Sequence, residues 1–187
     1  MIFLSISDKR IKDVVAIAID PQNSNHVYLG SFSNGLIELN NGSITSLKDA
    51  QNSVLDSTFF GSTATSAITF DSGNNLWILN SYTTDVLTVK TPSGDWHKFS
   101  FPGKASSQDP YTRILIDDND YKWILAPDND YVIIFNDNNT LDDKSDDVSI
   151  LNDNIPGAKL FDICKDKDGE IWVGTDEGVA VFYNPSN

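Results

Sequence analysis

The residue types that could support chemistry in this chain are mainly carboxylates, and one short segment invites a calcium interpretation. Asp166, Asp168 and Gly169 stand close together, as such residues do in the loop of an EF-hand. That loop has its glycine at the sixth position and oxygen ligands at the first and twelfth. The alignment puts Cys164 first and Thr175 twelfth, and neither residue supplies the required carboxylate. The segment therefore predicts a turn, in which aspartate accepts backbone N–H groups and glycine takes a positive φ.

Histidine and cysteine are too scarce to build a catalytic or metal site. The two histidines, His26 and His97, lie in different parts of the chain, and neither belongs to a nucleophile motif. The single cysteine, Cys164, excludes an internal disulfide and is expected to be buried in its apolar run. With 24 aspartates, chance pairs of carboxylates are unavoidable and do not indicate sugar cleavage. The sequence predicts no catalytic residue, no metal and no cofactor.

Negative charge dominates the 187 residues, with 27 acidic side chains against 13 basic ones and a net charge of -14. This balance argues against nucleic acid as a partner, because the phosphate backbone would be repelled. Five of the aspartates fall in the run at 137–147. A loose divalent-cation site is one interpretation of that run, and a solvated loop is the preferred one.

Composition favours a β-rich domain that does not cross a membrane. Apolar residues make up 40% of the chain, and 24 Asp with 18 Asn against 3 Glu favour turns over helices. The longest fully apolar run, at 14–19, is far shorter than the roughly 20 residues that a bilayer requires. The apolar start at 1–4 is too short for a signal peptide. We therefore expect either a cytosolic protein or a piece of a larger exported one.

The chain contains four copies of one sequence motif. Each copy has a short apolar run, an aspartate, a polar turn, and then an aromatic residue inside a second apolar run. The aspartates are Asp20, Asp71, Asp117 and Asp166, and the aromatic residues are Tyr28, Trp77, Trp123 and Trp172. The aromatic residue follows the aspartate by six positions in three copies and by eight in the first. These four aromatic side chains are expected in the core, whereas Trp96 stands outside the repeat and is expected to be exposed.

Each copy continues with a third apolar run, and the first two copies add a weaker fourth. The runs are rich in β-branched and aromatic residues and are bounded by Gly, Asn and Asp, which is typical of hairpins. A four-stranded antiparallel unit of this length is a propeller blade. The sequence predicts an all-β propeller with blades at about 8–47, 57–101, 104–150 and 151–187. The innermost strands are predicted at 14–19, 66–70, 112–116 and 160–164.

The strand-like segment at 1–7 leaves two arrangements open. It could supply a fourth strand to the last blade and close a four-bladed ring, or it could be the outer strand of a preceding blade. In the second case the chain is an arc of a larger propeller, and this arrangement is preferred. An arc leaves two apolar sheet faces open, so we expect it to form a dimer through them or to aggregate.

The last repeat resembles a known family. Its run from Asp166 through Gly169, Trp172 and Thr175 to Gly178 is similar to the two-component-regulator propeller repeat. The earlier copies depart from that motif, since Asn80-Ser81 and Ala126-Pro127 replace its Gly-Thr. The ending GVAVFYNPSN and the acidic insertion resemble, more narrowly, the second propeller of PorZ-type surface proteins of the type IX secretion system in Bacteroidetes.

This resemblance implies an arc of a seven-bladed ring, an exported setting at the cell surface or in the periplasm, and no catalysis. It also implies a role in lipopolysaccharide delivery or surface attachment. The alternative is the extracytoplasmic, oligosaccharide-sensing propeller of a hybrid two-component sensor kinase. A lyase or hydrolase is a third hypothesis.

The ligand is expected at the face where the loops before each innermost strand meet those between the second and third strands. Aromatic and cationic side chains in these loops suit sugars, in particular anionic glycans. Other cell-surface components or protein partners are alternatives. The candidate ligand-binding residues are Arg10, Phe59, Phe60, Tyr82, Lys104, Tyr111 and Arg113.

Overall fold

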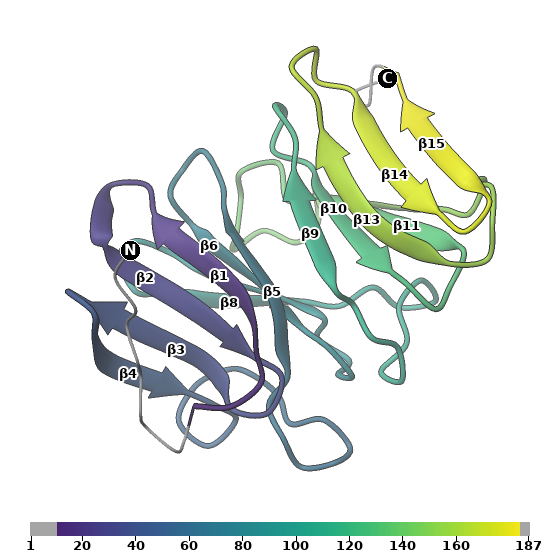
Figure 1. Ribbon diagram of the computed structural model, residues 1–187. Coiled ribbons are helices and arrows are strands. Elements are labelled where there is room, and N and C mark those ends of the chain that lie inside the picture. The colour runs from purple at the N-terminus through teal and green to yellow at the C-terminus, as the bar shows by residue number, and fades with distance from the viewer. Residues whose placement is uncertain (1–10, 184–187) are drawn as a thin grey trace, which may run out of the picture.

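The computed structural model describes residues 11–183, and within them every regular element is a strand (Figure 1). The first sheet holds β1 (Val14–Asp20), β2 (Asn23–Ser31), β3 (Gly35–Asn40) and β4 (Ser43–Lys48). The second holds β5 (Thr65–Phe70), β6 (Leu76–Asn80), β7 (Leu87–Lys90) and β8 (Trp96–Phe99). The third holds β9 (Arg113–Ile116), β10 (Lys122–Ala126), β11 (Tyr131–Asn136) and β12 (Val148–Asn152). The last holds β13 (Leu160–Lys165), β14 (Ile171–Thr175) and β15 (Gly178–Phe182).

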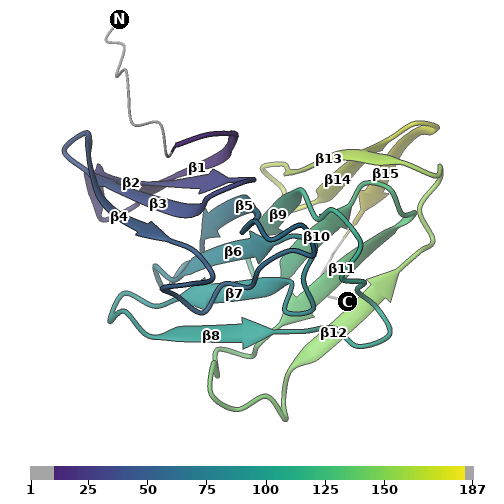
Figure 2. The same cartoon turned by 90° about the horizontal axis from the view of Figure 1, so that it is seen from below.

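The four sheets follow one another around an arc that does not close over the described residues. Figure 2 shows the first strands β1, β5, β9 and β13 along one side, with the fourth strands β4, β8 and β12 toward the outside. All strand pairs within a sheet are antiparallel and join chain neighbours. The expected all-β fold of propeller blades in an incomplete arc is confirmed. The segment at 1–7 lies outside the described residues.

The third sheet has the four strands expected of a blade, but the position of its fourth strand was not predicted from the sequence. β12 pairs with β11 and follows the acidic run at 137–147, for which a solvated loop was predicted. The side chains of Val148 and Ile150 on this strand are exposed. Over residues 11–183, the last sheet has three strands.

In three of the four repeats, the aspartate accepts a hydrogen bond from the tryptophan six residues later. The indole Nε1 of Trp77 donates to Asp71 Oδ2 at 2.7 Å, and Trp123 donates to Asp117 Oδ2 at 2.9 Å. The other carboxylate oxygen, Oδ1, accepts a backbone N–H inside the hairpin turn, from Asn75 in the first case at 2.8 Å. One carboxylate therefore closes the turn and orients the aromatic ring. This is the physical reason for the spacing of six.

The last repeat has the same geometry. Trp172 donates to Asp166 Oδ2 at 3.0 Å, and Asp166 Oδ1 accepts from the Glu170 backbone at 3.0 Å. Burial would raise the pKa of Asp166, but the hydrogen bonds from Trp172 and from backbone amides outweigh it and lower that pKa.

The first repeat replaces the tryptophan with Tyr28, and its polar contacts change accordingly. Asp20 faces the ring of His26 at 3.2 Å, while the Tyr28 hydroxyl donates to Glu38 at 3.3 Å. Lys90 of the next sheet donates to the same hydroxyl at 3.1 Å. Burial, and then the charge of Glu38, raises the pKa of Tyr28 above its usual value.

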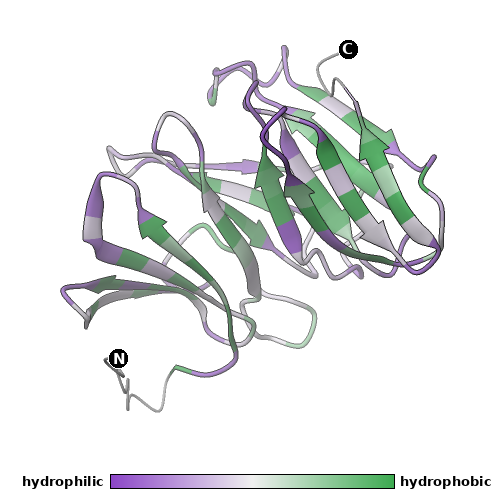
Figure 3. Ribbon diagram, turned by 45° about the horizontal axis from the view of Figure 1, so that its top comes forward, coloured by the Kyte–Doolittle hydropathy of each residue, from purple (hydrophilic) through white to green (hydrophobic). Residues whose placement is uncertain are grey.

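Successive sheets pack by one rule, which places the repeat aromatic residue of one sheet against a phenylalanine of the next. The ring centroids are 5.9 Å apart for Tyr28 and Phe70, 6.3 Å for Trp77 and Phe135, and 5.0 Å for Trp123 and Phe182. All three pairs meet edge to face, the arrangement that the ring quadrupole favours. Figure 3 shows that hydrophobic residues lie mainly on the strands and hydrophilic residues mainly in the loops.

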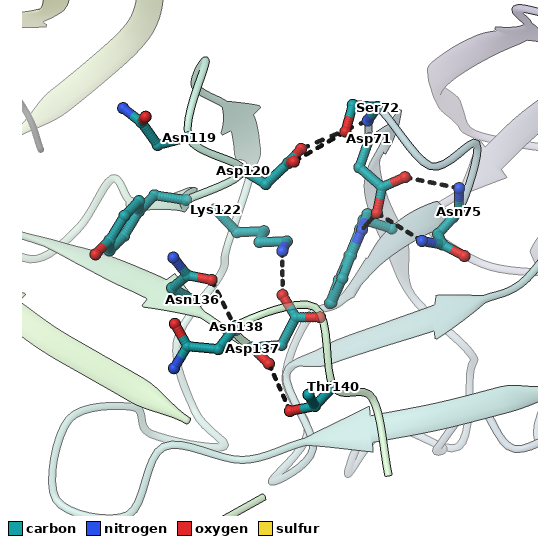
Figure 4. Close-up of polar contacts among 12 residues, drawn as sticks. Asp71, Ser72, Asn75, Asn119, Asp120, Lys122, Asn136, Asp137, Asn138 and Thr140 are labelled. Atoms are coloured by element: carbon teal, nitrogen blue, oxygen red, sulfur yellow. Dashed lines mark hydrogen bonds and ion pairs between the residues drawn. The ribbon is translucent and has the colours of Figure 1, made fainter. Parts of the chain in front are cut away.

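A buried ion pair lies between the second and third sheets. Lys122 and Asp137 are almost completely buried, and the ammonium group contacts the carboxylate (Figure 4). The same ammonium lies 4.3 Å from the centroid of the Trp77 ring. Nearby, Ser72 Oγ donates to Asp120 Oδ2 at 2.8 Å and joins the turns of the two sheets.

Three expectations about single residues need correction. Cys164 is exposed, because its strand presents it on the outer face of the last sheet, which no described segment covers. Trp172 lies on that same face and is 37% exposed, unlike the other repeat tryptophans. Trp96 was expected on the surface but packs partly buried against the cluster around Ile68 and Ile78.

We predict that Asp71→Ala lowers the free energy of unfolding by about 3 kcal/mol. The substitution removes charge-assisted hydrogen bonds and leaves the buried indole N–H of Trp77 without its acceptor. Urea denaturation measures the loss, and Asp153→Ala at an exposed aspartate is the matched control. Equal small effects of the two substitutions would refute the structural role of the repeat aspartate.

We also predict that Lys122→Met lowers the free energy of unfolding by about 3–5 kcal/mol, because it leaves the buried carboxylate of Asp137 without its cationic partner. Adding Asp137→Leu should restore most of the lost stability, since a matched apolar pair needs no charge compensation. Unfolding of the single and double variants in urea checks both statements. A double variant less stable than the single one would contradict this account of the pair.

Candidate functional site

A cleft of about 960 Å³ opens at the face of the arc where ligand-binding loops were expected. Its lining comes from three loops, at 49–64, 81–86 and 100–112, which belong to different hairpins and sheets. The lining residues are Asp56, Ser57, Phe59, Tyr82, Thr83, Thr84, Asp85, Ser107 and Gln108. The mixture of two rings with hydroxyl, amide and carboxylate groups suits a polar ligand that also has apolar faces.

An aromatic cluster forms one wall of the cleft. The rings of Phe59 and Tyr82 meet edge to face with centroids 6.1 Å apart, and Phe60 lies 3.8 Å from Phe59. Phe32 supports Tyr82 from the first sheet at 5.9 Å. Phe59 is nevertheless 66% exposed, so its ring is available to a ligand.

Tyr82 holds an unusual backbone conformation at this site. Its φ of 59° lies in the left-handed region, which a bulky side chain adopts only when its surroundings impose it. The Tyr82 N–H donates to the Asp109 carbonyl at 3.3 Å, and Thr83 Oγ1 donates back to the Asn80 carbonyl at 2.6 Å. These bonds direct the Tyr82 ring toward Phe59.

Asn80 and Ser81, which depart from the repeat motif, anchor the loops around the cleft. The buried Asn80 amide accepts from the Asp56 N–H at 2.6 Å and donates to the Ala64 carbonyl at 3.3 Å. Ser81 Oγ donates to the Tyr111 carbonyl at 2.6 Å. Thus one dipeptide at the end of β6 connects loops from both neighbouring regions of the chain.

Two carboxylates and one ammonium group set the charge of the cleft. Lys98 of β8 lies 2.6 Å from Asp56 and 2.8 Å from Asp85. Burial would lower the pKa of Lys98, but hydrogen bonds and negative charge from the two aspartates outweigh it and raise that pKa. The three groups together carry a net negative charge, which disfavours an anionic ligand beside them.

The structure brings together only the aromatic part of the predicted site. Phe59 and Tyr82 line the cleft, and Phe60 packs on Phe59. Tyr111 is completely buried, and its hydroxyl accepts from the Ser106 N–H at 2.9 Å. It cannot touch a ligand on this surface, so the prediction for Tyr111 is wrong. Its aromatic ring is part of the core.

The predicted cations do not gather at the cleft. Lys104 Nζ donates to the carbonyl and hydroxyl of Ser149 at 2.9 and 2.8 Å. Arg113 pairs with Asp162 of the last sheet at 2.9 Å, and Arg10 lies outside the described residues. Lys98, Asp56 and Asp85 were not anticipated, since nothing in their spacing shows that three distant residues would meet.

A smaller cavity of about 230 Å³ lies at the opposite ends of the first two sheets. His26 borders it, with one ring nitrogen 3.2 Å from Asp20 and the other 2.6 Å from Glu38. Within residues 11–183, no three His, Cys, Asp or Glu side chains are placed to hold a metal ion. The same part of the chain contains no helix long and apolar enough to cross a membrane.

Comparison with known proteins agrees with the repeat and the arc. Residues 154–177 match the family model for the two component regulator propeller. No curated protein matches the sequence. The resemblance to this repeat, inferred from the last blade, is confirmed.

Three solved structures illustrate the similarity. PorZ, an essential bacterial surface component of the type IX secretion system of Porphyromonas gingivalis, is 25% identical with a TM-score of 0.84, over 93% of this chain and 25% of PorZ. The extracellular domain of the hybrid two component system BT3049 from B. thetaiotaomicron is 19% identical with a TM-score of 0.66, over 98% and 23% of the two chains. Virginiamycin B lyase from Staphylococcus aureus is 14% identical with a TM-score of 0.64, over 93% and 56%.

The chain therefore spans about a quarter of the length of PorZ. The similarities to the BT3049 domain and to the lyase, both at lower identity, show the propeller fold alone. The expected resemblance to PorZ-type proteins is confirmed at the level of sequence and fold.

We predict that the stability contributed by Lys98 is present at neutral pH and declines in alkaline solution. Its pKa is raised in the folded protein, so the contribution is complete below the usual value of 10.5 and is lost as the pH passes the raised pKa. Urea unfolding measures the free energy of unfolding of the wild type and of Lys98→Met. The difference between the two proteins should be smaller at about pH 11.5 than at about pH 8. Lys167→Met, at an exposed lysine, is the control. If the effect of Lys98→Met on the free energy of unfolding were the same at both pH values, the ion pairing of Lys98 with Asp56 and Asp85 would be contradicted.

Proposed function

We propose that this chain is a non-enzymatic binding segment of a PorZ-like propeller protein of the type IX secretion system, at the cell surface or in the periplasm. The cleft lined by Phe59 and Tyr82 holds the sugar portion of a surface glycan during lipopolysaccharide delivery or attachment. The observation that carries this proposal is the exposed ring of Phe59 above a hydroxyl-rich cleft. The similarity to PorZ over nearly the whole chain supports it.

The chemistry of the cleft favours a neutral or amine-bearing sugar unit. Aromatic faces stack on the C–H surfaces of a sugar, while Thr84 and Gln108 offer hydrogen bonds to its hydroxyls. Asp56 and Asp85 would repel a carboxylate or phosphate placed beside them. An anionic lipopolysaccharide therefore binds through its neutral core sugars, with its phosphates outside the cleft.

A sensor domain of a hybrid two-component system is the second candidate. The match of residues 154–177 to the regulator propeller favours it. Both candidates use the same cleft to bind an oligosaccharide, and they differ in what binding triggers. As a protein partner we propose a second copy of the chain, which would form a dimer through the open sheet faces at the ends of the arc. This dimer does not involve the glycan cleft.

We predict that Phe59→Ala and Tyr82→Asn each weaken oligosaccharide binding about tenfold, because each removes an aromatic contact worth about 1–1.5 kcal/mol. Asparagine is chosen at position 82 because it tolerates the left-handed conformation. Isothermal titration with a neutral oligosaccharide, an amine-bearing chitosan oligosaccharide and a polygalacturonate fragment measures affinity and charge preference.

Phe161→Ala is the matched control, since this exposed aromatic residue lies on β13 outside the cleft. The neutral and amine-bearing sugars should bind better than the anionic one. Identical affinities of wild type and both cleft variants, or preferred binding of polygalacturonate, would count against the proposal.

A further inference from the structure

A second, smaller cavity adjoins the cleft and shares with it the loop that carries Phe59. Its volume is about 80 Å³, and its lining comes from the turn between β2 and β3 and from the loop at 49–64. Ser57 borders both cavities. A ligand that fills the cleft can therefore place a substituent in this small cavity.

Hydrogen bonds fix the shape of the loop that the two cavities share. The N–H of Thr58 donates to the Ser62 carbonyl at 2.7 Å, and the N–H of Gly61 donates to the Thr58 carbonyl at 2.9 Å. Phe59 and Phe60 lie inside this closed turn, and both rings are exposed. The aromatic surface of the cleft and the small cavity are thus held in a fixed relation.

The small cavity contains an acceptor that the fold leaves unused. The side-chain oxygen Oδ1 of Asn34 is buried and accepts no hydrogen bond from any residue at 11–183. The backbone of Asn34 is held firmly, because its N–H donates to Ser31 Oγ at 2.9 Å and the residue forms a parallel bridge with Thr63. A buried acceptor without a partner costs about 1–3 kcal/mol, which a ligand that donates a hydrogen bond would recover.

The charge of the small cavity selects the kind of donor. Asp49 borders it, and its Oδ1 accepts the Gln51 N–H at 2.9 Å. Among the described side chains that line the cavity, none is a lysine or an arginine. An ammonium group suits this lining, because it has three N–H donors and no acceptor, and because the carboxylate attracts its charge.

We infer that the small cavity receives the amino group of an amine-bearing sugar, while a neighbouring unit of the same oligosaccharide stacks on Phe59 in the cleft. The volume agrees with a substituent and not with a further sugar ring, since a cavity of roughly 150 Å³ is the size that binds benzene. The inference rests on the proposed function, because the cleft must hold a sugar. It adds which substituent the protein recognises and which side chains recognise it.

The test compares three β-1,4-linked trimers that differ only at carbon 2 of each unit. These are the trimers of glucose, of glucosamine and of N-acetylglucosamine, which carry a hydroxyl, an amino and an acetamido group there. Isothermal titration at about pH 6, where the amine is protonated, measures each affinity. The glucosamine trimer should bind about tenfold more tightly than the other two, as expected for a hydrogen bond to a charged group.

Two substitutions at one position should move this preference in opposite directions. Asn34→Leu removes the acceptor, so the advantage of the glucosamine trimer should disappear while the affinity for the glucose trimer changes less than about twofold. Asn34→Asp keeps the size of the side chain and adds a negative charge, so it should strengthen binding of the glucosamine trimer about fivefold. Asn139→Asp is the matched control, because it adds the same charge at an exposed residue beyond the opposite end of its strand and should change nothing. Circular dichroism verifies that each variant is folded.

Failure of this inference can be distinguished from failure of the proposed function. If the glucose and glucosamine trimers bind equally well and Phe59→Ala weakens both about tenfold, the cleft binds sugar and the inference about the amino group is wrong. If a preference for glucosamine survives Asn34→Leu, the amino group binds elsewhere and the inference is again wrong. If none of the three trimers binds, the proposed function fails and the inference fails with it.

Discussion

The structure depends on one aspartate carboxylate in each of three repeats, which accepts hydrogen bonds from both the hairpin turn and the indole ring. One oxygen of Asp71 accepts a backbone N–H in the hairpin turn, and the other accepts the indole N–H of Trp77. Because the ring is fixed relative to the turn, it meets the phenylalanine of the next sheet in the same way at each interface. Repetition of this contact turns four small sheets into an arc. In the first sheet, where Tyr28 replaces tryptophan, Glu38 and Lys90 provide the polar partners instead.

This arrangement separates stability from recognition. The aspartate turns lie at one end of the strands, and the loops at the other end are free to differ among repeats. In the second repeat, Asn80 and Ser81 replace the Gly-Thr of the motif and hold the loops that form the cleft. Tyr82 adopts a strained left-handed conformation, and hydrogen bonds of its loop to the surrounding structure hold it there. The candidate cleft is therefore built from departures from the repeat.

Much of the fold could be predicted from the sequence, because the six-residue spacing between aspartate and tryptophan reflects the hydrogen bond that joins them. The aspartates, the strands before and after them, and burial of Trp77 and Trp123 all follow from that period. The cleft could be predicted only in part. Aromatic loop residues such as Phe59 and Tyr82 signal a surface that core packing does not require, but a linear pattern cannot show that Tyr111 turns inward or that Lys104 is bound by Ser149. Cys164 and Trp172 were misjudged because their exposure depends on a neighbouring sheet, which the pattern of one repeat does not reveal.

The aspartate–indole hydrogen bond is a strong and specific coupling within each of the three repeats that contain a tryptophan. A double-mutant cycle of Asp117→Ala and Trp123→Phe tests it most directly, because the cycle cancels the separate losses of turn bonds and of packing. Free energies of unfolding of the wild type, both single variants and the double variant should give a coupling of about 1.5–3 kcal/mol. A coupling near zero would mean that the two residues stabilise the sheet independently, and it would contradict the account.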